Sequence, residues 1–346
     1  MAALPQPQSM PLGRPGPLTE AERFMWDSAG FLIVEDALSE KETAECLAAA
    51  QRVHSNRELL SKLQVEQFGA PSEVEQFNES LGGDLQESWR QIGNAYEYER
   101  AFECLIDHPS VFPKARELFG GHLILQGSWL TQVPPEYGKD GGGMHQDGGL
   151  VHTMFKPPAP LMQMRIGYVL TDLSDAATGN LWCVPGSHSA TVDYPAGVDC
   201  RTLPLAIPIL ARAGSAIMFH QALFHTGGYN DKDYCRYMMH MSEQQRRLGL
   251  TVADSDGRPL LRTVYGAPWL ARIDRSTTSQ AFLSRVTPRQ RLLLGEFETS
   301  TAPFHSSPFT FHPPEEGGGG GGAGEGGEEK QWDQFLNGAA PTRNRL

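Results

Sequence analysis

The first part of the chain has apolar residues at the spacing of helices, with start and stop signals at their ends. In LTEAERFMWDSAG, Thr19 and Glu22 have the spacing of a capping box, and Gly30 suits a helix end. Phe24 and Met25 give this helix an apolar face. The apolar run FLIVEDAL that follows predicts a short strand.

A second capping box at Ser39 and Glu42 predicts a longer helix through KETAECLAAAQRVHS. The segment HPSVFPKARELFG predicts a further helix, which Gly120 would end. We therefore expect the chain to be mainly helical up to about residue 120.

From about residue 121 the pattern changes to short apolar runs separated by Gly, Pro, Asp and Asn. These runs are HLILQGSWLTQV, APLMQMRIGYVLTDL, NLWCVPGS, LPLAIPIL, SAIMFHQALF and CRYMMHMSEQ. Because no helical pattern lies between them, they predict an antiparallel sandwich or jelly roll. The expected fold class is mainly β with flanking helices.

The run LMQMRIGYVLTDL alternates between apolar and polar positions. The even positions from Met162 to Leu170 are apolar, whereas the odd positions include Gln163, Arg165 and Thr171. Successive side chains of a strand point to opposite faces, so one face packs and the other is polar. The polar face either meets solvent or lines a wet cavity inside a jelly roll, and the alternation does not distinguish the two.

The two ends of the chain differ from the region between them. Residues 1–17 contain five prolines and predict a flexible segment. Residues 301–346 are rich in Gly and Glu, and seven of the eight residues 317–324 are glycine, which predicts a disordered tail. We expect one domain over residues 18–300, with a helical first part and a jelly-roll core at about residues 121–248.

Charge and composition exclude some classes of function. The 29 Lys and Arg residues against 41 Asp and Glu give a net charge of −12, which repels phosphate backbones, so nucleic acid is not an expected partner. No segment has the pattern of a signal peptide or of a membrane span, so membrane insertion is not expected. The sequence does not indicate an oligomeric state.

Cysteine usage and the C-terminus bear on location. The five cysteines form no closely spaced ligand pair and indicate a reduced chain, so we expect a cytoplasmic protein. A peroxisomal location is the alternative, because the chain ends in Arg-Leu, although Asn344 replaces the usual small residue of that address.

A glycine-rich loop at residues 141–149 carries His145 and Asp147. It is either a flexible surface loop or a place where something must approach closely. The glycines fit neither a phosphate-binding P-loop nor a dinucleotide-binding turn, because no Gly-Lys-Ser/Thr or GxGxxG leads into a helix. If the loop ends in extended backbone, His145 and Asp147 point to the same face and can bind one metal ion.

A third ligand is expected from AGSAIMFHQALFHTGGYNDKDYCRYMMH, which offers His220 and His225. Two imidazoles and one carboxylate leave positions open on Fe(II), as oxygen chemistry requires, whereas zinc usually prefers a closed or nearly closed tetrahedron. Arg236 follows His225 by 11 residues, past a turn. It is placed to hold a small dicarboxylate that also touches the metal.

The order and spacing of these motifs resemble the phytanoyl-CoA dioxygenase family of Fe(II)- and 2-oxoglutarate-dependent oxygenases. The similarity covers about residues 18–248 and includes LTEAERFMWDSAGFLIVEDALS, the HxD motif, GNLWCVPGSH and HTGGYNDKDYCR. The family fold is a double-stranded β-helix, a cupin-like jelly roll with helices packed outside. This implied fold agrees with the pattern of strands.

The resemblance assigns a role to each matching residue. His145, Asp147 and His225 correspond to the iron ligands, and Arg236 to the arginine that binds the 5-carboxylate of 2-oxoglutarate. Gln163 lies where the family places a residue near the cosubstrate. His225 is preferred to the neighbouring histidine because it alone matches both the following turn and the arginine spacing.

The chain departs from the family pattern at one position. Family members often carry a serine two residues after the distal histidine, where this chain has Gly227, and Thr226 is the candidate substitute. Three further residues are candidates for the substrate pocket, each with a structural alternative. His152 is such a candidate, and its alternative is a polar residue of a surface loop. Arg165 is the second, and its alternative is an ion pair within the strands. His188 is the third, and its alternative is a place in a turn. We expect His240 to serve in packing and Cys183 and Cys235 to be buried thiols.

The resemblance implies an enzyme that hydroxylates an unidentified small organic molecule. It would use Fe(II), 2-oxoglutarate and O2, and form succinate and CO2. Acyl or lipid-derived molecules and secondary metabolites are both open as substrates. Asp147 favours hydroxylation over halogenation, because the related motif of iron halogenases lacks the carboxylate.

Two other functions remain open at this point. One is a non-catalytic jelly-roll module that binds a metal or ligand, and the other is a zinc or manganese cupin-like hydrolase or isomerase. The second would need no arginine 11 residues after the histidine. Because ligand histidines must be neutral, the affinity for iron is expected to fall as the pH drops through about 6.5.

Overall fold

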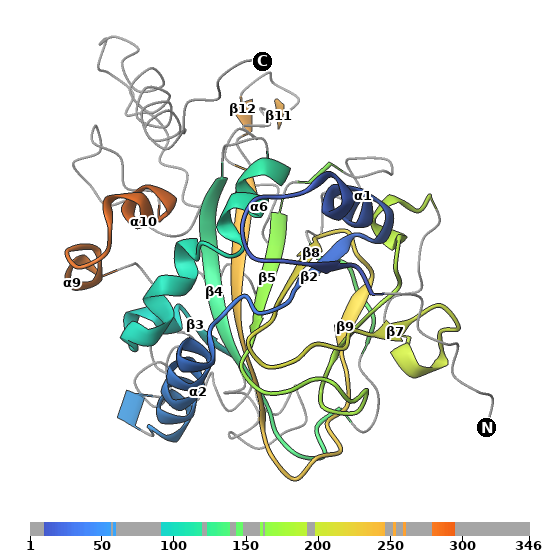
Figure 1. Ribbon diagram of the computed structural model, residues 1–346, viewed down its shortest axis with the longest axis horizontal. Coiled ribbons are helices and arrows are strands. Elements are labelled where there is room, and N and C mark those ends of the chain that lie inside the picture. Colours follow the sequence, from blue (N-terminus) through green and yellow to red (C-terminus); the bar gives the residue numbers. More distant parts are fainter. Residues whose placement is uncertain are drawn as a thin grey trace.

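The described part of the chain is a β-sandwich with helices packed outside it (Figure 1). The computed structural model describes residues 10–56, 58–59, 91–119, 123–138, 143–147, 160–161, 163–191, 198–245, 252–253, 259–260 and 279–294. The strands are β1 (Leu12–Gly13), β2 (Phe31–Val34), β3 (Gln91–Gly93), β4 (Leu123–Val133), β5 (Gln163–Val169), β6 (Leu181–Cys183), β7 (Ile207–Pro208), β8 (Ala216–His220), β9 (His225–Gly227), β10 (Arg236–Gln245), β11 (Val252–Ala253) and β12 (Pro259–Leu260). The helices are α1 (Glu20–Ala29), α2 (Glu40–Ser55), η1 (Ala95–Glu97), η2 (Arg100–Asp107), α6 (Phe112–Leu118), η3 (Ser187–Ser189), η4 (Cys200–Thr202), α9 (Gln280–Leu283) and α10 (Pro288–Leu293).

Two sheets make up the sandwich. The larger has the strand order β1-β2-β8-β5-β10-β4-β3, and the smaller has the order β7-β6-β9. Neighbours in the larger sheet, such as β8, β5 and β10, are antiparallel but distant in sequence, so the chain crosses repeatedly between the sheets. The predicted jelly roll with flanking helices is therefore confirmed.

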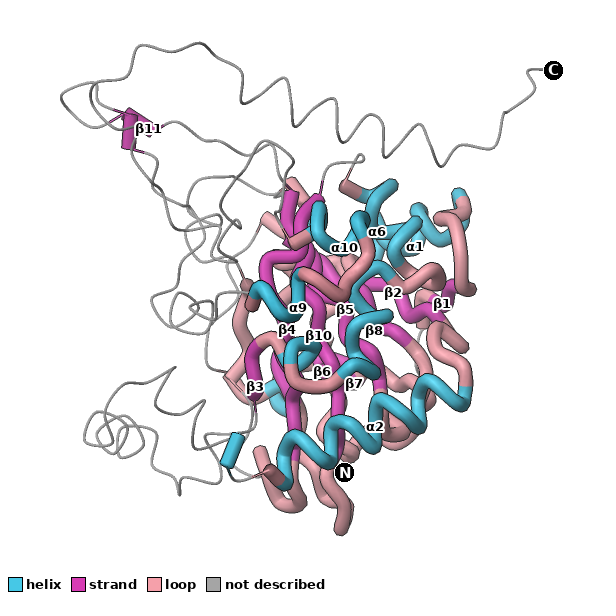
Figure 2. The backbone as a smooth tube through the Cα atoms, turned by 90° about the vertical axis from the view of Figure 1, so that its left-hand side faces the viewer, coloured by secondary structure: helices cyan, strands magenta, loops and turns pink. Residues whose placement is uncertain are grey.

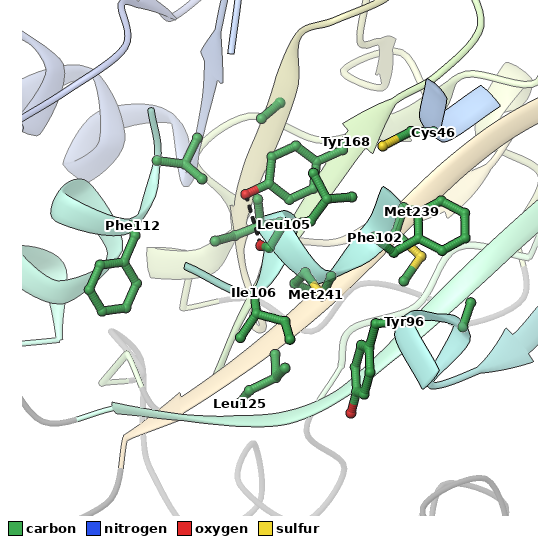
Figure 3. Packing of buried hydrophobic residues seen from close by; sticks show 14 of the residues in the cluster. Cys46, Tyr96, Phe102, Leu105, Ile106, Phe112, Leu125, Tyr168, Met239 and Met241 are labelled. Atoms are coloured by element: carbon green, nitrogen blue, oxygen red, sulfur yellow. Dashed lines mark hydrogen bonds between the residues drawn. The ribbon is translucent and has the colours of Figure 1, made fainter. Parts of the chain in front are cut away.

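Helices cover the outer face of the larger sheet. In Figure 2, α2, α9 and α10 lie on the viewer's side of the strands. The core beneath the helices contains the even positions of β5, Met164, Ile166 and Tyr168. Figure 3 shows the Tyr168 hydroxyl donating a hydrogen bond to the carbonyl oxygen of Leu105 in η2, at 3.2 Å. The apolar face of β5 thus packs against helices, as the alternation predicts.

The odd positions of β5 point between the two sheets. Gln163 and Arg165 are only 2% and 8% exposed, and Val169 packs in a second core cluster with Leu181 and Phe219. Of the two interpretations of the polar face, the structure therefore selects the internal cavity and excludes the solvent-exposed surface.

The predicted helix signals of α1 are confirmed at both ends. The Thr19 hydroxyl accepts a hydrogen bond from the Glu22 N–H, the Glu22 carboxylate accepts one from the Thr19 N–H, and Gly30 has the left-handed φ of 79°. The predicted apolar face is wrong at Phe24, which is 72% exposed, whereas Trp26 is buried. The helix packs through the bulky indole of Trp26. The spacing of its apolar residues alone did not show which face of the helix would be buried.

The proline-rich N-terminal segment is partly structured, contrary to the prediction. Leu12 and Gly13 form β1, which pairs in parallel with β2. The backbone N–H groups of Ile33 and Glu35 donate to the carbonyl oxygens of Pro11 and Gly13. Proline lacks an N–H but keeps its carbonyl, so this pairing does not need the donor that proline has lost.

Some predictions lie outside the described residues. These are the tail at 301–346, the first nine residues, Gly120 and His152. The domain boundaries likewise stay predictions. Within the described part, no helix is long and apolar enough to span a membrane.

Candidate metal centre and cosubstrate cavity

Backbone pairing brings the glycine-rich loop to the start of β9. The His145 N–H donates to the His225 carbonyl at 2.9 Å, and the His225 N–H donates to the His145 carbonyl at 2.8 Å. Two residues later, the Asp147 N–H donates to the carbonyl of Gln221. This segment is therefore extended, which places the side chains of His145 and Asp147 on one face, as the metal-site prediction requires.

The three predicted ligands converge. The His145 Nε2 lies 4.0 Å from Asp147 Oδ1, and the His225 Nε2 lies 3.8 Å from Asp147 Oδ2. Ligand atoms of all three residues lie within 4.8 Å of one another, and no other such group of His, Cys, Asp or Glu occurs in the described residues. The set has two imidazole nitrogens and one carboxylate on one side of a shared space.

Hydrogen bonds fix which nitrogen of each imidazole faces the metal position. The His225 Nδ1 lies 2.7 Å from the Leu223 carbonyl oxygen, and the His145 Nδ1 lies 3.2 Å from that of Gly143. A carbonyl only accepts, so each Nδ1 carries the proton and each Nε2 has a free lone pair. This is the arrangement that metal-binding histidines commonly use.

The alternative ligand His220 lies elsewhere. Its ring packs against those of Trp26 and His188, with centroids 6.3 and 5.3 Å away, and its Nδ1 accepts from the backbone N–H of Ala222. The preference for His225 is thus supported by position.

Charge and burial prepare the ligands for a cation. Burial by itself raises the pKa of Asp147, but the Arg165 guanidinium, whose Nε donates to Asp147 Oδ2 at 2.9 Å, holds that pKa well below its usual range. Burial lowers the pKa of His225 to about 4, while the nearby Asp147 acts in the opposite direction. At neutral pH the site therefore offers an ionised carboxylate and a neutral buried imidazole, the forms that bind metal.

Arg236 enters the same cavity from the start of β10. Its Nε and Nη2 both donate to the carbonyl oxygen of Gly179, at 2.9 and 2.6 Å. Its Nη1 is buried and has no hydrogen-bond partner in the described structure. Burial lowers the pKa of Arg236 to about 10, so the side chain keeps its charge at neutral pH. A buried cationic donor without a partner is costly, and a carboxylate would satisfy it.

The metal group and Arg236 line one cavity of about 170 Å³ between the sheets. The remaining lining residues are Trp129, Thr131, Arg165, Leu181, Phe219, Gly227, Met238 and His240. His240 packs against Gly167, as expected, and it also lines this cavity. Arg236, Met238 and His240 alternate along β10, so the period-two pattern of the strand was the signal that could have identified His240.

Sequence comparison adds an independent observation. The profile of the phytanoyl-CoA dioxygenase family matches residues 26–236, more than half of the 346-residue chain. The chain belongs to the phytanoyl-CoA dioxygenase family. A curated relative, Dioxygenase trt7 of Aspergillus terreus, is 28% identical over 144 residues, which cover 40% of this chain and 48% of the relative. The match thus spans about half the length of that relative.

Solved structures share the fold. EctD from S. alaskensis, crystallised with 2-oxoglutarate and 5-hydroxyectoine, has a TM-score of 0.50 at 16% identity, covering 66% of this chain and 77% of EctD. The carbocyclase SnoK from nogalamycin biosynthesis has a TM-score of 0.47 at 21% identity, covering 66% and 87% of the two chains. At 16% identity the likeness to EctD is one of fold.

The residue at which this chain departs from the phytanoyl-CoA dioxygenase family pattern faces the cavity. Gly227 is a lining residue, and a Cβ atom added there would meet nothing within 4 Å. Thr226, the candidate substitute, does not line the cavity. It is opposite Trp182 in the β6–β9 pair, and its hydroxyl contacts the Gly227 carbonyl at 3.4 Å. Neighbouring strand residues face opposite sides, so Thr226 cannot point where His225 and Gly227 do.

The other residues proposed from the family resemblance differ in whether they line the cavity. Arg165 lines the cavity, as the pocket hypothesis requires, and it also forms the strand ion pair that was the alternative. Gln163 is buried on the same face of β5 but is not among the lining residues. His188 is buried in η3 against Gly30 and His220 and is not among the lining residues. His152 lies outside the described residues.

The thiols fit their expected role only in part. Cys183 is fully buried in β6 of the smaller sheet, and burial raises its pKa. Cys235 is only half-buried. Neither lines the cavity.

Proposed function

We propose that this protein is an Fe(II)- and 2-oxoglutarate-dependent oxygenase that hydroxylates a small organic molecule. When bound, the iron and cosubstrate supply the oxidation in which 2-oxoglutarate, O2 and R–H give succinate, CO2 and R–OH. The location that fits this proposal is cytoplasmic.

The unpaired Nη1 of Arg236 is the observation that carries the proposal. A metal site alone would suit many jelly-roll proteins, but a buried guanidinium that shares its cavity with the metal ligands suits a dicarboxylate that reaches both. The non-catalytic module and the zinc or manganese hydrolase have no use for such a group. EctD, which has the same fold, was crystallised with 2-oxoglutarate.

The donor set fits Fe(II). Two imidazole nitrogens and one carboxylate that held Fe(II) would leave coordination positions for a chelating cosubstrate and for O2. His145, Asp147 and His225 would hold the metal, and Arg236 the far carboxylate of 2-oxoglutarate.

The protein's own contribution is positioning and exclusion of water. The Nδ1–H bonds to backbone carbonyls hold both rings in one orientation, and the Arg165 guanidinium holds Asp147. Phe219 packs edge-on against His225, with ring centroids 4.9 Å apart. These contacts leave few other orientations open to the ligands, which favours one reactive geometry.

Anaerobic titration of the full chain with Fe(II) and 2-oxoglutarate tests the proposal. We expect a visible charge-transfer band in the wild type. Arg236→Ala should bind Fe(II) yet need far more 2-oxoglutarate for the band, whereas His225→Ala should lose Fe(II) binding. A folded, metal-loaded wild type without a band would overturn the proposal and favour the binding module.

A further inference from the structure

Arg165 is a buried cation whose hydrogen-bond donors are only partly occupied. The residue is 8% exposed and lines the cavity, and its Nε donates to Asp147. In the part of the chain that the structure describes, neither of its two terminal nitrogens has a hydrogen-bond partner. Holding Asp147 requires only one donor, so this role does not account for the other end of the guanidinium.

The orientation of this guanidinium is fixed from two sides. Its Cζ lies 4.3 Å from the centroid of the Trp129 ring, and its Nε is held by Asp147. Stacking on an indole face and an ion pair both favour a flat, immobile guanidinium. A preorganised pair of N–H donors in a cavity is the usual means of recognising a carboxylate.

The two arginines enter the cavity from different ends. Arg236 pairs with Val133 in the β10–β4 ladder, whereas Arg165 lies opposite Ser242, six positions further along β10. Asp147 is bound to Arg165, so the metal position lies next to it. If 2-oxoglutarate reaches from the metal to Arg236, as the proposed function requires, Arg165 is left facing the rest of the cavity.

The charges of the site point the same way. With histidines counted as neutral at pH 7, the charged side chains among the described lining residues are Arg165, Arg236 and Asp147, a sum of +1. Fe(II) adds +2 and 2-oxoglutarate −2, so the loaded site keeps one positive charge. One further negative charge would neutralise it, and an unpaired charge in a buried site is costly.

We propose that Arg165 binds a carboxylate of the substrate, so that the substrate is a small monocarboxylic acid with an apolar body. Leu181, Phe219 and Met238 supply apolar cavity walls, and Phe219 lies opposite Arg165 in the β5–β8 pair. A carboxylate on the terminal nitrogens lies one guanidinium group away from a metal ligand. The carbon atoms next to that carboxylate would therefore be the ones presented to the metal. This inference rests on the proposed function.

Paired acids and amides test the proposal by binding. The probes are acetate, hexanoate and phenylacetate, each compared with its uncharged amide in calorimetric titrations of the anaerobic full chain loaded with Fe(II) and saturating 2-oxoglutarate. We expect at least one acid to bind about ten-fold or more tightly than its amide, the size of one charge-assisted hydrogen-bonded pair. Equal affinity of acid and amide in all three pairs would overturn the proposal.

Two variants test whether Arg165 causes the preference for the acid over the amide. Arg165→Gln should abolish it, and Arg165→Lys, which keeps the charge, should retain part of it. The Fe(II) affinity of both variants is measured first, so that loss of the metal site is separated from loss of anion binding. A preference that survives in Arg165→Gln contradicts the assignment.

Arg236→Ala separates this proposal from the proposed function. Titrated with Fe(II) alone, Arg236→Ala should keep the preference for the acid although its 2-oxoglutarate binding is strongly weakened. Loss of the preference in this variant would assign the anion to Arg236 and overturn the role of Arg165. If the wild type does not bind 2-oxoglutarate, the proposed function is wrong. If the wild type binds 2-oxoglutarate but binds acids and amides equally well, only the proposed substrate class is wrong.

Discussion

Individual ionisable residues in the metal group are held in the form that binds metal. Asp147 stays charged because Arg165 offsets the cost of its burial, and His225 stays neutral because burial disfavours its protonated form. The expectation that metal binding weakens through about pH 6.5 treated both histidines as ordinary. The structure changes that expectation for His225.

Proton release on metal binding tests this point. With the pKa of His225 lowered to about 4, its imidazole is already unprotonated above that pH and has no proton to lose. We therefore expect Fe(II) to displace at most one proton from the two histidines between about pH 5 and 7. Calorimetry in buffers of different ionisation enthalpy counts the protons, and release of two would contradict the burial of His225.

Gly227 offers a gain-of-binding test. It lines the cavity with open space around the position of a Cβ atom, and the family pattern has a serine there. Gly227→Ser should strengthen 2-oxoglutarate binding about five-fold, because one added hydrogen bond contributes about 1 kcal/mol. The Kd from the anaerobic titration gives the answer. Gly227→Ala is the control, and an equal gain there would mean that the hydroxyl is not responsible.

Among the elements, α1 and α6 are joined by a buried ion pair. The Lys114 Nζ lies 2.7 Å from Glu22 Oε2 and also donates to the Pro17 carbonyl, and both side chains are almost inaccessible. Glu22 accepts further bonds from the backbone N–H groups of Thr19 and Arg14. This cluster attaches the N-terminal segment and α1 to the rest of the fold.

Lys114→Met should destabilise the protein by about 3–5 kcal/mol, because it leaves the buried Glu22 charge without its partner. Chemical denaturation of both proteins measures the difference. Arg23→Met, which breaks the exposed pair with Glu117, should cost less than about 1 kcal/mol. Similar losses in the two variants would show that the buried pair contributes no more than a surface pair.

The pH dependence of this difference has a definite sign. Burial raises the pKa of Glu22, but the bonds from Lys114 and the backbone outweigh it and hold that pKa below the ordinary 4.5. The stabilisation from this carboxylate is thus complete above the unfolded pKa and is lost as the pH falls through the lower folded value. The difference in the free energy of unfolding between wild type and Lys114→Met should therefore become smaller at acidic pH.

At the scale of the whole molecule, residues 279–294 complete the helical layer, although they are far in the sequence from the other helices of that layer. Phe282 of α9 is fully buried and stacks on Tyr96, with ring centroids 5.0 Å apart. Arg285 forms an ion pair with Glu103 in η2, and Gln290 donates to the carbonyl of the same residue. The C-terminal helices are thus part of the same core as η1 and η2.

Phe282→Ala should lower the free energy of unfolding by about 3–5 kcal/mol, as removal of a buried aromatic ring usually does. Phe24→Ala is the matched control, because Phe24 is 72% exposed and should change stability by less than about 0.5 kcal/mol. Thermal unfolding measures both. Equal stability of Phe282→Ala and wild type would show that α9 does not hold the helical layer together.

The sequence by itself determined the local features of this protein. The capping boxes of α1 and α2 and the alternation of β5 depend on neighbours within a few residues, so they could be identified directly. His145 and Asp147 are two residues apart, and their shared face follows from strand geometry. The sequence offered His220 or His225 as the third ligand and Arg236 beyond the turn, and the resemblance to a family selected His225.

Only the tertiary structure decided which polar residues share the cavity. His240 and Arg165 meet there because β10 pairs with β5, a contact between segments about 75 residues apart in the sequence. Thr226 and His188 are not among the residues that line the cavity, because the facing side of a short strand or turn depends on what packs against it. Period and spacing fix a side chain relative to its own element, whereas burial, pKa and partners are properties of the packed whole.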